Sequence, residues 1–299
     1  MRSDRLEQFK NEFVKNRKPL RFYFSLAVLT VILVVHVTNP PKTTLSAPRE
    51  AEASTSPASP CDSAQAPAVS LRCISFNEHL YAVADVHLQS QGIIFTASDE
   101  HKMETFPVVV SHLASAGVKP LLVTNAGIYG TDNRPLGLLI SPQGKLHSVN
   151  RASGAGRGNF SWDSAVFQIA DDDTASIVPA LSWQDNVHTV AATQSGPQLV
   201  SSSKVNQSLP VQAKWVYSRT AIGVDQSDRK IVHVTVSRDA VTLFELATFM
   251  ANELHCSEAL HLDGALSAFY IPNSSDKFVF SDPGERIVTA LSVVEKKNK

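Results

Sequence analysis

Four charged side chains stand beside glycine-rich or apolar segments, where they could bind and cleave an anionic sugar derivative. They are Arg157, Arg219, Asp132 and Asp263. An arginine guanidinium presents a planar fork that matches phosphate and carboxylate oxygens. Two carboxylates are what cleavage of an acetal or phosphoacetal requires, as acid, base or nucleophile. A structural ion pair is the equally open alternative for Arg219.

Polar residues near the same glycines could hydrogen-bond the hydroxyls of a sugar. They are Asn125, Asn159, Thr193, Gln194 and Ser195. The glycine-rich stretch 153–160 lacks the G-x-G-x-x-G spacing of a dinucleotide site, and we interpret it as a loop whose backbone N–H groups could cradle an anion. No G-x-S-x-G serine nucleophile motif is present. These residue types together favour an anionic, hydroxylated ligand.

A strand, helix and strand occur in the same order twice, and they position several of these residues. The first copy spans residues 93–127 and the second spans residues 231–265. Each copy ends in an apolar strand followed by a short polar residue and a glycine. These residues are Asn125 and Gly127 in the first copy and Asp263 and Gly264 in the second. They are also turn formers, but their matching places favour one shared pocket floor.

Short strands with glycine and proline between them separate the two copies. They are residues 134–141, 164–170, 192–200 and 219–225. Strands that follow one another without intervening helices indicate antiparallel pairing. The predicted class is therefore α+β, a mostly antiparallel or mixed β-sheet with packed helices and an internal pseudo-repeat.

The N-terminal part of the chain differs in composition from the rest. Residues 1–21 carry seven basic and three acidic side chains, and the apolar run 22–38 follows directly. This order predicts a single transmembrane signal-anchor helix with a cytoplasmic N-terminus, although the run is short for a full span. A cleaved signal peptide and a buried core helix are the alternatives. Residues 39–70 are rich in Ala, Ser, Pro and Thr, which predicts an extended linker.

Residues 71–299 form the predicted exported domain, on the periplasmic side of the inner membrane. They hold 18 basic and 22 acidic side chains, a net charge of -4, so nucleic acid is not an expected partner. In an oxidising compartment Cys61 and Cys73 are candidates for a disulfide, and Cys256 is predicted to be a buried apolar residue. No cofactor is predicted, no metal ligands are assigned, and a divalent metal is left open.

Five segments, in order, resemble the phosphodiester glycosidase family, in its short exported bacterial form. They are VTNAGIYGTDNRPLGLLI (123–140), SGAGRGNF (153–160), ATQSGPQLV (192–200), SRTAIGVD (218–225) and ALHLDGALSAFYIP (259–272). The resemblance implies hydrolysis of a sugar-1-phosphodiester, of the N-acetylglucosamine-1-phosphodiester type. It also implies that residues 71–299 are one domain of this family. Two departures, at Ala268 and at residues 162–165, affect the expected sugar specificity.

The resemblance implies roles for individual residues. Arg219 is expected to bind the phosphodiester, Asp263 to act at the anomeric carbon or to protonate the leaving oxygen, and Asp132 to be a further catalytic carboxylate. The expected substrate-binding residues are Asn125, Gly127, Arg157, Asn159, Ser195, Gly196, Gly264 and Ser267. Two rival hypotheses remain: a non-catalytic envelope protein that binds a glycan or phosphoglycan, and a metal-dependent phosphodiesterase.

Overall fold

The structure is a computed structural model that describes residues 69–98, 102–152, 163–264, 267–274, 278–280 and 285–296. The predicted basic tail, the predicted anchor and nearly all of the predicted linker lie outside these residues. Within the described ranges, no helix is both long enough and apolar enough to cross a membrane. The anchor therefore stays a prediction.

The largest sheet has seven strands in the order β1-β2-β14-β13-β15-β11-β12. Their bounds are Ser70–Phe76 (β1), His79–His87 (β2), Ile231–Ser237 (β14), Thr220–Asp225 (β13), Cys256–His261 (β15), Gln198–Ser201 (β11) and Lys204–Val205 (β12). Every adjacent pair is antiparallel. The antiparallel character predicted from the short, glycine-punctuated strands is confirmed here.

A second sheet has five strands in the order β17-β16-β5-β19-β3. Their bounds are Phe278–Val279 (β17), Phe269–Tyr270 (β16), Pro120–Asn125 (β5), Thr289–Glu295 (β19) and Gln91–Ala97 (β3). A third sheet has the order β7-β6-β10-β8-β9, and β18 pairs with β4. These strands are Gly144–His147 (β7), Leu139–Ser141 (β6), Thr189–Ser195 (β10), Ala165–Ala170 (β8), Ala175–Pro179 (β9), Arg286–Ile287 (β18) and Glu104–Thr105 (β4).

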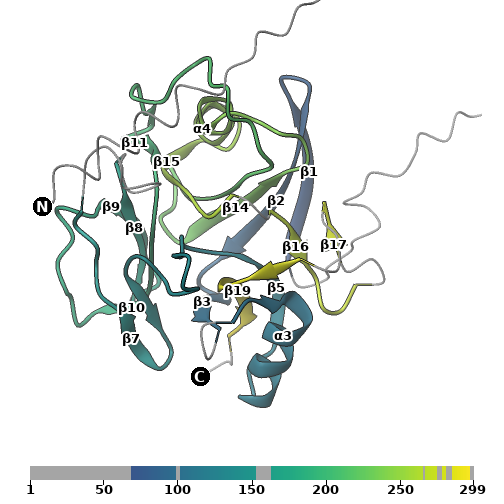
Figure 1. The fold of residues 1–299 in the computed structure, drawn as a ribbon, viewed down its shortest axis with the longest axis vertical. Helices are drawn as coiled ribbons and strands as arrows, with labels where there is room; N and C mark the ends of the chain where they lie inside the picture. The colour runs from purple at the N-terminus through teal and green to yellow at the C-terminus, as the bar shows by residue number, and fades with distance from the viewer. Residues whose placement is uncertain are drawn as a thin grey trace, which may run out of the picture. The chain divides into compact units, whose positions relative to one another are not determined.

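Two helices cover the outer faces of the first two sheets (Figure 1). Helix α4 (Leu243–Asn252) packs its apolar face on the seven-stranded sheet, and α3 (Phe106–Ser115) packs on β5, β16 and β19. The remaining faces of the two sheets meet each other and enclose the largest apolar cluster. Because both faces of these sheets are covered, their strands contain long buried stretches rather than a simple alternation.

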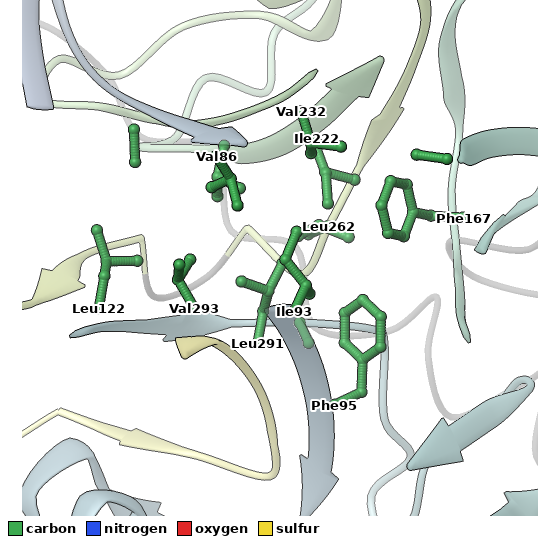
Figure 2. Close-up of a cluster of buried hydrophobic side chains, with 14 of the residues drawn as sticks. Val86, Ile93, Phe95, Leu122, Phe167, Ile222, Val232, Leu262, Leu291 and Val293 are labelled. Atoms are coloured by element: carbon green, nitrogen blue, oxygen red, sulfur yellow. The ribbon is translucent and has the colours of Figure 1, made fainter. Parts of the chain in front are cut away.

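Figure 2 shows the apolar cluster between the sheets. Val86, Ile222 and Val232 come from the seven-stranded sheet, and they face side chains of β3, β5 and β19. Phe167 of the third sheet approaches Phe95 edge to face, with ring centroids 6.0 Å apart. Because all three sheets contribute to one core, the strand ends that carry polar residues are held by a rigid scaffold.

The predicted repeat is present as two split β-α-β units. In the first split unit, β3, α3 and β5 follow in sequence, and β19 lies between the two strands. In the second split unit, β14, α4 and β15 follow in sequence, and β13 lies between them. Each inserted strand is antiparallel to both neighbours, so the outer strands of a unit are parallel to each other.

The register of the two units corrects how their ends correspond. Ala290 of β19 pairs with Asn125, and Ala221 of β13 pairs with His261. Asn125 therefore corresponds to His261, and Gly127 corresponds to Asp263. The sequence spacing instead matched Asn125 with Asp263, two residues too far along the second unit, because local patterns do not show which residues of β13 and β15 pair.

The cysteines occupy different environments. Cys256 is a free and fully buried thiol on β15, as predicted, and burial raises its pKa above the ordinary value. Its Sγ lies only 2.5 Å from the position of a Cβ added to Gly223, so α4 and β15 require glycine at that place in β13. Cys73 is disulfide-bonded. Cys61, its predicted partner, lies outside the described residues.

Candidate active site

The ends of the two split units meet, and backbone and side-chain hydrogen bonds join them. The Asp263 N–H donates to the Ala126 carbonyl at 2.8 Å, and the Asn125 side-chain amide donates to the Asp263 carbonyl. The Asn125 Oδ1 accepts from the Thr220 hydroxyl at 2.8 Å. The backbone of Asp263 is thus fixed on both sides by the first unit. The geometry gives Asn125 a positioning role, and its expected contact with a sugar stays a prediction.

Arg219 lies immediately before β13, and its guanidinium is held at three points. Nε donates to the Val241 carbonyl at 2.9 Å, and Nη2 donates to the Trp215 carbonyl at 3.3 Å. Nη1 lies 3.4 Å from Nε2 of His261. A guanidinium has five N–H groups, so two of them, one on each terminal nitrogen, have no partner among the described residues.

The charge of Arg219 is compensated by no carboxylate in the described part of the chain. The residue is only 6% exposed. Among the described residues, the neighbour that affects the pKa of Arg219 is the Tyr217 phenol, which raises it. Burial lowers the pKa of Arg219 to about 10, so the guanidinium remains charged at neutral pH. A buried cation without a counter-ion opposes folding. It is the arrangement expected where an anionic ligand provides the missing charge.

His261 supports Arg219 in a single protonation state. Its Nδ1 lies 3.0 Å from the Gly196 carbonyl, which can only accept, so the ring proton is on Nδ1. The unprotonated Nε2 then accepts from Arg219. Burial and the neighbouring guanidinium lower the pKa of His261 to about 3. The sequence favours a structural role in the sheet for His261 over metal ligation, and a neutral imidazole fits that role. Gly196, a predicted substrate-binding residue, contributes its carbonyl to His261.

Two glycines allow segments of the site to approach closely. A Cβ on Gly264 would lie 2.7 Å from His261 Nε2 and 3.6 Å from Arg219 Nη1. A Cβ on Gly127 would lie 2.6 Å from the Thr193 hydroxyl and 2.7 Å from the Gln194 carbonyl. Any larger residue would push these groups apart. Gly264 thereby places the backbone next to Asp263 against the guanidinium.

Sequence reasoning missed Tyr129, whose phenol lies close enough to the catalytic candidate Asp263 for the Asp263 charge to raise its pKa. Tyr129 is half-buried on the segment that follows β5, and burial together with the Asp263 charge raises the pKa of its phenol. The only signal in the sequence is its place between two glycines, Gly127 and Gly130. A phenol with a raised pKa keeps its proton at neutral pH, so it can donate a hydrogen bond.

Asp132 lies in a different setting from Asp263. It is exposed on the turn that joins Tyr129 to Pro135, and its carboxylate accepts from the Arg134 N–H at 3.2 Å. Its Oδ2 is 3.8 Å from the Arg134 guanidinium. These contacts are local to the turn. Among the described residues, no contact joins Asp132 to Asp263, and the catalytic role of Asp132 stays a prediction.

The Gln194 side chain forms hydrogen bonds with Leu138 and with Asn150, which lies just before the glycine-rich loop. Its Oε1 accepts from the N–H groups of Leu138 and Asn150, at 3.1 and 2.8 Å. Its Nε2 donates to the Asn150 carbonyl at 2.6 Å. These bonds use the side chain for positioning rather than for binding a sugar. Arg157 and Asn159 of the loop itself lie outside the described residues.

Several buried hydroxyls near these segments have no hydrogen-bond partner among the described residues. They are the side chains of Thr193, Ser195 and Ser267. Ser195 precedes the glycine whose carbonyl holds His261, and Ser267 follows Gly264 by three positions. A buried hydroxyl without a partner is costly, so these groups are suited to a ligand that supplies one.

No group of three or more His, Cys, Asp or Glu side chains arranged to hold a metal ion occurs in the described ranges. The histidine with the most acidic neighbours is His233 on β14. Its two ring nitrogens lie 2.7 Å from Asp85 and 3.2 Å from Asp225. Arg72 also pairs with Asp85, so these side chains form a network of polar contacts across four strands rather than a set of metal ligands.

Comparison with known proteins shows the family of the chain. The family model for phosphodiester glycosidase matches residues 119–294, which include Asn125, Arg219 and Asp263. The chain therefore belongs to the phosphodiester glycosidase family, as its five ordered segments predicted. At the level of the family, membership indicates a hydrolase that acts on phosphodiester-linked sugars.

Individual relatives are more distant. The uncharacterized protein YigE of Escherichia coli strain K12 is 27% identical over 177 residues, which cover 58% of this chain and 66% of YigE. The catalytic domain of zebrafish N-acetylglucosamine-1-phosphodiester alpha-N-acetylglucosaminidase, auto-inhibited by its pro-peptide, aligns with a TM-score of 0.55 at 15% identity. That alignment covers 77% of this chain and 82% of the zebrafish chain, and it shows a shared fold.

Proposed function

We propose that this protein hydrolyses a sugar-1-phosphodiester, of the N-acetylglucosamine-1-phosphodiester type, and releases the free sugar. Water adds its hydroxyl to the anomeric carbon. The bond between that carbon and the oxygen bridging to phosphorus breaks, and a phosphate monoester leaves with this oxygen. We further propose that the domain is exported and held at the inner membrane by the predicted anchor. The sugar is suggested by the family and by the name of the zebrafish relative.

One observation carries the proposal: Arg219 is a buried cation with two unused N–H groups and no acidic partner in the described part of the chain. A phosphodiester has two non-bridging oxygens that share one negative charge, and these oxygens fit this fork. As the bond to the sugar breaks, negative charge grows on the departing phosphate. A fixed positive charge at that place lowers the barrier more than it stabilises the substrate.

Asp263 is the group proposed to act at the anomeric carbon. Its backbone is fixed by Ala126 and Asn125, and Gly264 follows it directly against the guanidinium. The carboxylate can activate the attacking water or stabilise the positive charge that develops on the sugar ring. Tyr129 beside it can donate a hydrogen bond to a sugar oxygen. Phosphate is a good leaving group, so proton transfer to it is the smaller contribution.

Turnover of defined diesters tests the proposal. Wild-type protein, Asp263→Asn and Asp132→Asn would be incubated with a panel of hexosamine-1-phosphate diesters, and sugar release would be measured. We expect wild type to release sugar and Asp263→Asn to lower kcat about 10²- to 10⁴-fold. Because the contacts of Asp132 among the described residues are local, Asp132→Asn is expected to lower kcat by less than about tenfold; a loss as large as that of Asp263→Asn would instead support the catalytic role predicted from the sequence.

The bond that breaks distinguishes the rival hypotheses. In ¹⁸O-labelled water a glycosidase places the label on the sugar, whereas a metal-dependent phosphodiesterase places it on phosphate and loses activity in a chelator. The alternative of a non-catalytic glycan- or phosphoglycan-binding protein predicts binding without turnover. Absence of turnover on every diester, with binding retained, would reject the enzyme and support that alternative.

A further inference from the structure

A chain of side-chain hydrogen bonds leads from the start of β13 to Asp263. The Thr220 hydroxyl donates to the Asn125 Oδ1 at 2.8 Å, and the Asn125 side-chain nitrogen donates to the Asp263 carbonyl. The Thr124 hydroxyl also donates to this Oδ1, at 3.1 Å. Thr220 and Asn125 are both buried. Loss of either link would leave a buried polar atom without its partner, which is costly.

The partners of the Asn125 amide fix its orientation. The Asp263 carbonyl oxygen can only accept, so the amide nitrogen of Asn125 must face it and Oδ1 must face the Thr220 hydroxyl. If the amide turned over, its oxygen would face the Asp263 carbonyl, and two acceptors would repel each other. The Thr220 hydroxyl therefore holds the amide in the orientation that supports Asp263.

A threonine occupies the matching position in the first split unit. The Leu262 N–H donates to the Thr220 carbonyl at 2.9 Å, and the Ala126 N–H donates to the Thr289 carbonyl at 3.0 Å. Thr289, the first residue of β19, therefore corresponds to Thr220, the first residue of β13. The two threonines allow a direct comparison of how each unit holds the end of its last strand.

The two hydroxyls are used differently. The Thr289 hydroxyl donates directly to the Gly127 carbonyl. The carbonyl that matches it in the second unit belongs to Asp263, and here the Asn125 amide lies between the carbonyl and the Thr220 hydroxyl. Gly127 has no side chain to orient, whereas Asp263 carries the carboxylate proposed to act at the anomeric carbon. The additional link is thus present at the position whose orientation matters for the reaction.

We propose that Thr220 is a positioning residue, which acts through Asn125 to hold the peptide of Asp263 and so to direct its carboxylate. This inference rests on the proposed function and adds a residue that makes it efficient. Gly264 follows Asp263 and restricts the backbone less than any other residue type, so the peptide between them depends on the bond from Asn125. Displacing a reacting group by about 1 Å can cost about 10²-fold in rate.

Substitutions of Thr220 that keep its size test the proposal on a hexosamine-1-phosphate diester. Thr220→Val removes the hydroxyl and is expected to lower kcat about 10- to 100-fold with KM within about twofold of wild type, because Arg219 still binds the phosphate. Thr220→Ser retains the hydroxyl and is expected to keep kcat within about threefold. If Thr220→Val does not fold, Thr220→Ala is measured in its place.

Thr235→Val is the matched control. Thr235 is equally buried on the neighbouring strand β14, and its hydroxyl donates to the Ala82 carbonyl at 3.0 Å, away from Asp263. Its kcat is expected to equal that of wild type. A loss in Thr235→Val or Thr220→Ser as large as that in Thr220→Val would overturn the proposal, as would a rise in KM with kcat unchanged.

A double-mutant cycle tests whether Thr220 acts through Asn125. In an Asn125→Ala background, Thr220→Val is expected to lower kcat by less than about twofold further, because the link is already broken. The same fold-loss in both backgrounds would show that Thr220 acts by another route, and it would reject the inference while leaving the proposed hydrolysis intact.

Hydrogen exchange of the Asp263 amide gives a measurement that does not depend on turnover. This N–H donates to the Ala126 carbonyl at 2.8 Å, and we expect its exchange, followed by NMR, to be at least about tenfold faster in Thr220→Val than in wild type or Thr235→Val. If wild type hydrolyses no diester, the proposed function fails, and this measurement decides whether Thr220 positions Asp263. Equal exchange in all three proteins would overturn the inference.

Discussion

The two split β-α-β units share one backbone plan but carry different side chains at matching places. Backbone hydrogen bonds relate Ser98 and Val288 in the first unit as they relate Ser237 and Arg219 in the second, at 2.8 and 2.9 Å. Arg219 therefore corresponds to Val288. By the same register, His261 corresponds to Asn125 and Asp263 corresponds to Gly127.

The difference separates what the fold needs from what the chemistry needs. Val288 is buried at its position, so the scaffold accepts an apolar residue where the second unit buries a cation. Arg219, His261 and Asp263 are therefore not required by the sheet geometry. Their cost to stability is explained if they serve a ligand, a pattern expected of functional sites. The first unit contributes positioning instead, through Asn125 and the carbonyl of Ala126.

The strongest test of this comparison replaces Arg219 of the second unit with valine, the residue at the matching position of the first unit. Arg219→Val is expected to lower kcat/KM for a diester about 10³-fold, because the charge that stabilises the departing phosphate is lost. Its unfolding free energy in urea is expected to equal or exceed that of wild type, because an unpaired buried cation is removed. Arg238→Val, at an exposed arginine, is the control and should change neither quantity. Unfolding of Arg219→Val would contradict the comparison.

A second transfer, His261→Asn, tests the neutral histidine. The pKa of His261 is about 3 in the folded protein against an ordinary value of 6.5. The unfolded chain therefore takes up the proton first, and stability falls as pH drops from 6.5 toward 3. Between pH 6 and pH 4 we expect wild type to lose about 2 kcal/mol more than His261→Asn, measured by urea unfolding. Identical pH slopes for the two proteins would show that His261 is not held neutral.

The smallest effect concerns the starts of the two helices. The Thr242 hydroxyl accepts from the Glu245 N–H at 3.1 Å, and the Glu245 carboxylate accepts from the Thr242 N–H at 2.7 Å. The corresponding Thr105 makes no side-chain cap. Thr242→Ala should therefore cost about 1 kcal/mol of unfolding free energy, and Thr105→Ala only a few tenths. Equal costs in thermal unfolding would mean that the caps do not distinguish the units.

Local patterns in the sequence predicted several elements closely. The first strand predicted in the copy at residues 231–265 is β14, and the helix predicted in that copy is α4. Strand β19 and the hairpin of β1 and β2 were not predicted, although β19 is the strand that divides the first unit. Strand pairing joins segments far apart in the chain, and a single sequence contains no local signal for the partner. For the same reason, the sequence could not show that Asn125 corresponds to His261 rather than to Asp263, two residues later.

The sequence by itself determined the family, the antiparallel class and the residues that could do chemistry, because these depend on residue type and short-range spacing. Only the tertiary structure decided how those residues divide. It joined Asp263 to Asn125 and Arg219 to His261, left Asp132 on an exposed turn, and added Tyr129 and Trp215 to the site. Burial, tautomer and the absence of a counter-ion in the described residues are properties of packed neighbours, and only folding brings those neighbours together.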